Sequence, residues 1–230
     1  MRTLLIAFVC GPLALGISQA DVLFDQIGNS DGSSLAGDIY GSQSFIPEYD
    51  LTAPIEAVDN FTLNADSQID AIEFVLDGWN GFDGPDGVVS WTVNIYSDLQ
   101  AAASNLVGDV LSRTVVPEVN PTWQGAGWLV NLPLDDVLES GDYLVGVLMA
   151  NPYPDHGWAG VATSMIGDQS AWQISPDGEG IYVFVPYIQT TDNLAYRVLG
   201  STIPAPASVF GLIPLLLGRR RRSARSTLPQ

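Results

Sequence analysis

Apolar and polar residues alternate along several short stretches of the chain, with the two-residue period of a β-strand. The clearest stretch spans residues 88–96, where four apolar side chains share one face and three polar side chains share the other. The apolar face holds Val89, Trp91, Val93 and Ile95, and the polar face holds Ser90, Thr92 and Asn94. Similar patterns predict strands at 61–63, 69–76, 128–132, 170–175, 181–185 and 194–199. Residues 143–149 are apolar on both faces, as in a central strand.

Turn-forming residues separate these stretches. Asp, Gly, Pro, Asn and Ser cluster at 83–87, 140–142, 151–152 and 176–178, and each of these residue types favours a reversal of the chain. Between the two ends of the chain, residues 99–106 form the only helical candidate. Many short strands joined by turns predict an all-β body, folded as a β-sandwich or jelly roll over residues 21–200.

The N-terminal segment has the pattern of a secretory signal peptide. Arg2 supplies the positive start, residues 4–17 form an uncharged and largely apolar helix, and Ser18-Gln19-Ala20 gives a small-x-small cleavage site before Asp21. We therefore expect residues 1–20 to direct export by the Sec route and to be removed. The single cysteine, Cys10, lies in this segment, so no disulfide can stabilise the body.

The C-terminal segment, residues 201–230, contains a second apolar run. Residues 203–218 carry no charge and would span about 24 Å as a helix, less than the roughly 30 Å of a bilayer core. Two interpretations remain: a processed tail signal, or an ordinary C-terminal membrane helix completed by arginine snorkelling. The shortness and the lead Pro-Ala-Pro-Ala-Ser at 204–208 favour processing. A basic cluster of the kind that stays on the cytoplasmic side ends the run: Arg219, Arg220, Arg221 and Arg222.

The order of these parts resembles the PEP-CTERM sorting signal of bacterial envelope proteins. The motif would be Pro204, Ala205 and Pro206, followed by the apolar helix 207–218 and the arginine cluster; Ala205 stands where the family usually has glutamate. The resemblance implies transient insertion of the helix in the inner membrane and recognition by an exosortase-like processing enzyme. Residues 58–63, 91–98 and 192–200 are similar to a β-sandwich domain often found ahead of such signals, which implies a fold but no activity.

The body is strongly acidic. All 26 acidic residues lie between Asp21 and Asp192, the chain has no lysine, and only Arg113 and Arg197 are basic there, so the formal charge of the body is 2 − 26 = −24. This charge excludes nucleic acid as a partner and argues against an anionic membrane surface. Solubility in salty surroundings and attraction of divalent cations remain as uses for the charge.

The segment 77–87 is a candidate calcium site. Asp77, Asp83 and Asp86 lie there among four glycines, and Ca²⁺ accepts six to eight oxygen ligands in irregular geometry. The spacing does not match an EF-hand. The alternative, which we favour, is a plain turn, since Asp and Gly both form turns readily.

Three tryptophans are candidate ligand-binding residues. Trp79, Trp123 and Trp158 are predicted in loops near amide and carboxylate groups. Aromatic faces beside such groups suit an extracellular polysaccharide, because the ring stacks on the apolar face of a sugar while polar groups bind its hydroxyls. The alternative, again favoured, is that these side chains cover the open ends of the sandwich.

No catalytic pattern stands out. His156 is the only histidine and has no cysteine partners for zinc, and no Gly-x-Ser-x-Gly element is present. A carboxylate pair for glycoside hydrolysis is not specific evidence in so acidic a chain. We therefore expect no enzyme, but a secreted protein of the cell envelope, outer surface or extracellular matrix with a structural or adhesive role. A calcium-assisted carbohydrate-binding module is the first alternative and a glycoside hydrolase the second.

Overall fold

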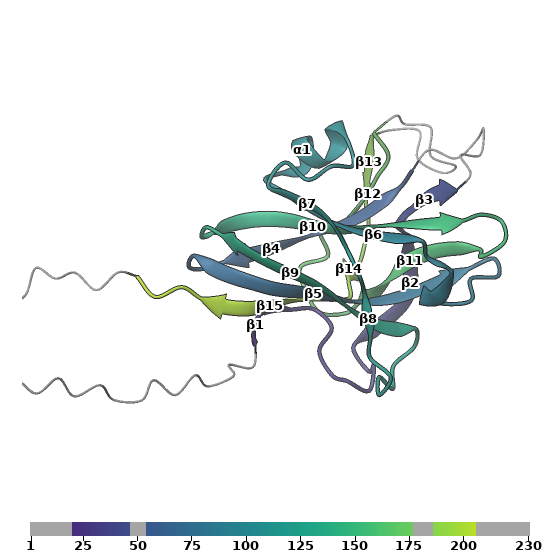
Figure 1. Ribbon diagram of the computed structural model, residues 1–230, viewed down its shortest axis with the longest axis horizontal. Coiled ribbons are helices and arrows are strands. Elements are labelled where there is room, and N and C mark those ends of the chain that lie inside the picture. The colour runs from purple at the N-terminus through teal and green to yellow at the C-terminus, as the bar shows by residue number, and fades with distance from the viewer. Residues whose placement is uncertain (1–19, 47–53, 177–185, 206–230) are drawn as a thin grey trace, which may run out of the picture.

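The computed structural model of the protein describes residues 20–46, 54–176 and 186–205. Over these residues the chain forms two twisted β-sheets that pack face to face, with one short α-helix outside them (Figure 1). The predicted all-β sandwich is confirmed. Residues 1–19 of the expected signal segment, the strand at 181–185, Pro206 of the motif, the apolar helix at 207–218 and the cluster Arg219–Arg222 lie outside the described residues.

The first sheet, sheet A, has β5 near its centre. Its hydrogen-bonded order is β1-β15-β5-β11-β14, while β9 pairs with β5 on its other side, β8 pairs with β9, and β2 pairs with β11. The pairs in this sheet are antiparallel. The strands are β1 (Asp21–Asp25), β2 (Leu35–Gly41), β5 (Ser67–Trp79), β8 (Glu118–Val119), β9 (Trp128–Leu138), β11 (Trp158–Ser164), β14 (Asn193–Leu194) and β15 (Tyr196–Thr202).

The second sheet, sheet B, has β10 at its centre. Its order is β13-β12-β4-β10-β6-β7, and β3 runs parallel to the last part of β10. The strands are β3 (Gln43–Ile46), β4 (Glu56–Leu63), β6 (Ser90–Tyr96), β7 (Leu111–Val115), β10 (Gly141–Pro152), β12 (Trp172–Ile174) and β13 (Tyr187–Gln189). The stretch predicted to be a central strand, 143–149, lies inside β10, which pairs on both sides.

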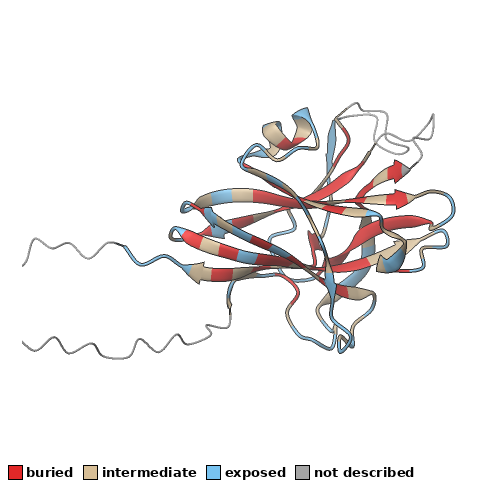
Figure 2. Ribbon diagram, in the orientation of Figure 1, coloured by how far each residue is buried: buried red, intermediate tan, exposed pale blue. Residues whose placement is uncertain are grey.

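The hydrophobic core lies between the two sheets, and both sheets contribute buried residues to it (Figure 2). On β5, the predicted inner residues Ile72, Phe74 and Leu76 are buried. The ring of Phe74 meets that of Trp91 from β6, with centroids 5.9 Å apart, so this contact joins the two sheets directly. The two-residue period of the sequence therefore predicts which side chains fill the core.

The stretch 88–96 departs from its predicted pattern at both ends. Val89 is 65% exposed instead of facing the core, because β6 begins only at Ser90 and the pairing of β6 with β7 reaches no further than Trp91. At the other end Asn94 is on the predicted polar face but is completely buried. The chain from α1 (Leu99–Ser104) to Gly108 covers that outer face of sheet B: the Asn94 amide donates to the carbonyl of Leu106 and accepts from the backbone N–H of Gly108.

The helix α1 confirms the helical candidate at 99–106. Asp98 begins it as a side-chain cap, since its carboxylate accepts a hydrogen bond from the backbone N–H of Ala101 at 2.8 Å. Ala102 is fully buried against sheet B. The described residues include no helix with the length and apolarity that a membrane span requires.

The two arginines of the body hold strands together. Arg113 on β7 donates to the carboxylate of Asp136 at 2.8 Å and to the carbonyl of Leu134 at 2.5 Å, both on β9, so it joins sheet B to sheet A. Arg197 on β15 forms an ion pair of 3.1 Å with Glu73 on β5. Both arginines of the body therefore form ion pairs within the protein.

The first and last strands of the body are neighbours. β1 begins at Asp21 and pairs antiparallel with β15, which ends at Thr202; Asp21 is opposite Gly200. Both ends of the folded body consequently leave the sandwich at the same end (Figure 1). The body fills the interval between the predicted cleavage site at Ala20 and the predicted motif at Pro204.

Candidate functional site

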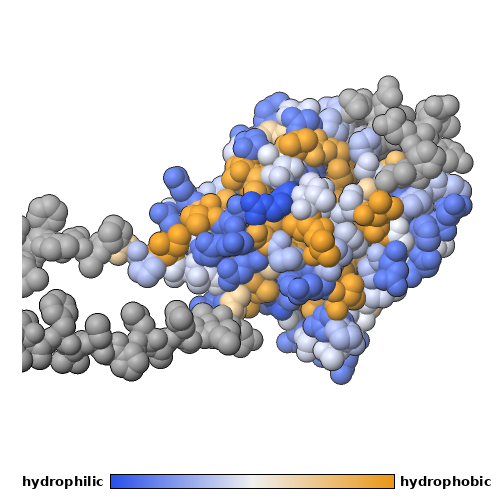
Figure 3. Space-filling model, viewed as in Figure 1, coloured by the Kyte–Doolittle hydropathy of each residue, from blue (hydrophilic) through white to orange (hydrophobic). Residues whose placement is uncertain are grey.

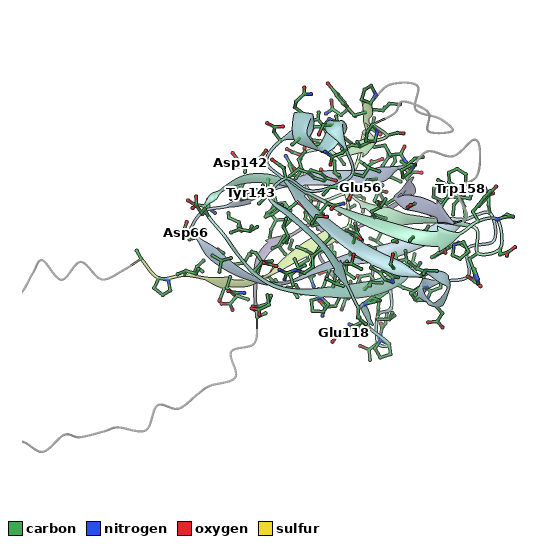
Figure 4. The ribbon with its side chains drawn as sticks, turned by 45° about the horizontal axis from the view of Figure 1, so that its top comes forward. Glu56, Asp66, Glu118, Asp142, Tyr143 and Trp158 are labelled. Carbon is green, nitrogen blue, oxygen red and sulfur yellow. The ribbon has the colours of Figure 1, made fainter. Side chains whose placement is uncertain are left out.

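Two of the three candidate tryptophans lie together, but inside strands. Trp79 is the last residue of β5 and Trp158 the first of β11, where they are register partners; their rings stack with centroids 5.5 Å apart. Trp158 is only 4% exposed, because Phe45 and Tyr153 also pack on it. The prediction that both tryptophans lie in loops is wrong. Trp158 closes one end of the sandwich, far from Asp66 at the other end (Figure 4), and its ring has no free face for a ligand.

Trp123 lies elsewhere. It sits in the loop between β8 and β9, as predicted, and packs half-buried on a small apolar cluster around Ile27 and Leu129. The structure therefore does not bring the three tryptophans into one binding surface. Trp158 instead has the packing role that the sequence offered as the alternative.

The three candidate calcium ligands are also dispersed. Asp77 belongs to β5 rather than to a loop, because β5 continues to Trp79, and its carboxylate accepts from the backbone N–H of Gly78 at 2.7 Å. Asp83 contacts His156, with 3.1 Å between the carboxylate Oδ1 and the ring Nδ1. Asp86 is exposed in a short 3-10 turn, η1 (Pro85–Gly87). Among the described residues, no group of three or more His, Cys, Asp and Glu side chains is placed to hold a metal ion.

Two buried carboxyl groups on β4 have raised pKa values. Burial raises the pKa of Glu56 to about 7, although hydrogen bonds from Tyr96 (2.5 Å) and Asn94 (2.9 Å) act in the opposite direction. Burial likewise raises the pKa of Asp59 to about 7, against hydrogen bonds from the backbone N–H groups of Leu194 and Asn60. Raised pKa values are typical of catalytic acids.

Neither carboxyl group is placed to meet a substrate. Glu56 faces the outer layer of sheet B, under the covering around α1, and Asp59 faces sheet A; both are fully buried. A general acid must reach the reacting group within hydrogen-bond distance. Since Glu56 and Asp59 are both enclosed, neither can act as a general acid unless the fold opens. We interpret them as structural residues whose charge costs stability.

The surface feature that best suits a ligand is a groove beside α1, on the outer face of sheet B. It has a volume of about 180 Å³ and is lined by residues from β4, β10, β12 and α1. Figure 4 shows Asp142 and Tyr143, which line it, on the side of the molecule that carries α1. We call this feature the α1 groove; the residues that matter below are Asn60, Asp98, Leu99, Asp142, Leu144 and Trp172.

The alternation of β4 and β10 explains the composition of the α1 groove. Phe61 and Val145 point into the core, so their neighbours Asn60 and Leu144 point outward, and these two are register partners. Leu144 is 6% exposed and packs in the same cluster as Leu99 and Trp172. The groove therefore combines an apolar floor with polar groups around it.

Hydrogen bonds hold the polar groups of the α1 groove in place. Asp142 accepts from the hydroxyl of Thr62 at 2.6 Å, and the amide of Asn60 donates to Asp168 at 3.1 Å. The hydrogen bonds from Ser170 and Asn60 lower the pKa of Asp168, so its carboxylate stays charged. Each group keeps further donor or acceptor capacity for a ligand.

Sequence reasoning missed the α1 groove. The strand predicted at 170–175 is confirmed in part as β12 and contains Trp172. The sequence did not indicate on which face of the sheet this side chain lies. The available signal was an aromatic residue in a short strand surrounded by polar residues. Only the pairing of β12 with β4, and of β4 with β10, brings Trp172 close to Asn60 and Asp142.

No model of a known protein family matches the chain, and no curated protein matches it.

Proposed function

We propose that the protein is an exported bacterial β-sandwich that its C-terminal segment sorts to the cell envelope or extracellular matrix, where it has a structural or adhesive role without enzymatic activity. One observation carries the proposal. The strands of the body begin at Asp21 and end at Thr202, so removal of residues 1–20 and of the tail after Pro204 would leave every described strand intact.

The position of the proposed sorting motif supports processing. Ile203 is held by a hydrogen bond from its backbone N–H to the carbonyl of Asp66, 2.8 Å long, and the chain then leaves the sheet. Pro204 and Ala205 are exposed. An exosortase-like membrane enzyme would therefore reach the motif without unfolding β15.

The charge of the body suits an extracellular location. Both arginines of the body are paired with acidic side chains, so the unpaired charges of the surface are acidic groups that favour solubility and repel anionic lipid. On the face shown in Figure 3, apolar side chains form separate patches between hydrophilic ones. Exposed valines such as Val89 and Val116 contribute to the apolar surface.

Removal of the motif tests the proposal. In a bacterium with an exosortase-like enzyme, we expect the double variant Pro204→Ala/Pro206→Ala to accumulate as a precursor in the inner membrane, because the processing enzyme no longer recognises it. The wild-type chain is expected in the outer or extracellular fraction. Immunoblots of the separated fractions measure the distribution, and Pro121→Ala, at an exposed loop position, is the matched control.

Two outcomes of that fractionation would contradict the proposal. One is a motif variant distributed like the wild type and the control. The other is wild-type protein in the cytoplasm with residues 1–20 still attached.

A second function, carbohydrate binding, is supported by the α1 groove rather than by Trp79, Trp123 and Trp158. It is compatible with the first, because an adhesive matrix protein has to hold a polymer. The calcium-assisted form of this proposal would need ligands beyond the dispersed Asp77, Asp83 and Asp86. The groove has hydrogen-bonding groups of its own.

A further inference from the structure

We propose that the α1 groove binds one ring of a neutral extracellular polysaccharide, without a metal ion. The inference rests on the proposed export of the protein, since such polymers are met outside the cell. It adds to that proposal a site, a ligand class and the residues that make the contacts.

The size of the α1 groove indicates how much of a polysaccharide it can hold. Its volume of about 180 Å³ is below the roughly 300–1,000 Å³ of pockets that enclose a whole drug-sized ligand. The groove lies on the open outer face of sheet B, beside α1. A single ring of a chain that continues across the surface fits these dimensions better than a free, fully enclosed ligand.

The apolar side of the α1 groove suits the C–H face of a sugar ring. Leu144 forms a nearly buried floor, and the half-buried side chains of Leu99 and Trp172 flank it. An indole that is only half-buried keeps part of its ring surface free. A sugar placed there buries apolar surface and gains an aromatic contact.

The polar side suits hydroxyl groups. A sugar hydroxyl both donates and accepts, and the groove offers both functions: acceptors on Asp98 and Asp142, and the amide of Asn60, which has donors and an acceptor. Hydrogen bonds to carboxylates are the stronger kind. Thr62 and the N–H of Ala101 already fix the two carboxylates, so binding orders few side chains.

The charge of the α1 groove decides between classes of polysaccharide. Asp98 and Asp142 line the groove, and Asp168 is hydrogen-bonded to Asn60 beside it; among the described residues that line the groove there is no arginine or lysine. The carboxylates of an acidic polysaccharide would be repelled. A cationic polysaccharide would be attracted to acidic groups over the whole body and would not depend on this groove, whereas a neutral chain depends on the apolar floor and the hydrogen-bonding groups found here. A neutral chain can pair its hydroxyl groups with the carboxylates and the Asn60 amide, and can place a ring face on the apolar floor.

Affinity electrophoresis of the full chain in mild detergent tests the proposal. Native gels would contain mixed-linkage β-glucan, xyloglucan, galactomannan or dextran as neutral probes, alginate as the acidic probe and chitosan as the cationic probe. We expect retardation by at least one neutral polymer, equally in EDTA and in millimolar Ca²⁺. Trp172→Ala and Asp142→Ala should each weaken the binding about tenfold, the loss expected for one good contact.

Two controls separate binding from folding. Asp70→Ala removes an exposed aspartate on β5 of the other sheet and should bind like the wild type. Trp172→Phe keeps an aromatic face and should retain more affinity than Trp172→Ala at an unchanged melting midpoint.

The inference would be overturned by no retardation by any neutral polymer, by retardation only by alginate or chitosan, or by unchanged retardation of folded Trp172→Ala and Asp142→Ala. Retardation that is lost in EDTA would also overturn the metal-free site. The assay uses purified protein, so its outcome does not depend on sorting. A failure of export and a failure of binding are therefore seen separately.

Discussion

The variant Glu56→Gln is expected to stabilise the protein at pH 8 and to destabilise it near pH 4.5. The pKa of Glu56 is raised from 4.5 to about 7 by burial, so between these values the folded protein binds a proton that the unfolded chain releases. Stability therefore falls as the pH rises through this window, and above pH 7 the buried charge costs about 3 kcal/mol. Glutamine removes that charge.

The glutamine itself has a cost. Its oxygen can still accept from Asn94, but its NH₂ group faces the hydroxyl of Tyr96, which then loses its acceptor. One such loss costs about 1 kcal/mol. The net effect on the free energy of unfolding is therefore about +2 kcal/mol at pH 8 and about −1 kcal/mol at pH 4.5, where the wild-type group is protonated in the folded state and half protonated in the unfolded state.

Urea unfolding of both proteins between pH 4.5 and 8 measures this change of sign. Glu118→Gln, an exposed position on β8, is the matched control and should behave like the wild type. The slope of stability against pH should shrink without vanishing in Glu56→Gln, since Asp59 has a similarly raised pKa. A variant that is less stable than the wild type at every pH would contradict the account of a costly buried charge.

The variant Phe74→Ala is expected to lose about 3–5 kcal/mol of stability. Phe74 is 1% exposed on β5, and its ring contacts Trp91 of the opposite sheet. It also borders an existing core cavity of about 10 Å³, together with Val145 and Tyr196. The truncation would enlarge that cavity between two paired sheets, which can close over it only in part.

Thermal unfolding measures the loss as a fall in the midpoint of about 6–20 °C, because each kcal/mol moves the midpoint of a domain of this size by roughly 2–4 °C. The midpoint of Phe74→Leu should fall by much less, since leucine fills most of the space of the phenylalanine ring. Val137→Ala, at a residue that is 59% exposed on β9, should change the midpoint little. Equal midpoints for Phe74→Ala and Val137→Ala would show that Phe74 is not a core residue.

The sequence predicted the strands whose alternation is long and apolar. β5, β6, β9 and β10 were anticipated because their inner faces carry large side chains, and α1 because of the run at 99–106. β11 was missed, since after Trp158 its residues are mostly small and do not alternate. β2 and β3 were missed because their pairing with β11 and β10 joins distant parts of the chain, which periodicity does not reveal.

The candidate sites were harder to predict than the strands. Loop positions were assigned to Trp79, Trp158 and Asp77 from neighbouring glycine, proline and aspartate, but strand pairing between β5 and β11 extends through all three. Asn60, Asp142 and Trp172 meet only through the order of strands in sheet B. The sequence predicts aromatic, amide and carboxylate side chains for a sugar-binding surface, but which residues of these types lie together follows only from the fold.

Export and processing at both ends of the chain are tested together by the intact mass of the protein recovered from the outer surface or medium. We expect a chain that begins at Asp21, because β1 begins there, and that ends within the motif at 204–206, with β15 complete. A recovered chain of all 230 residues, or one that retains residues 1–20, would contradict it.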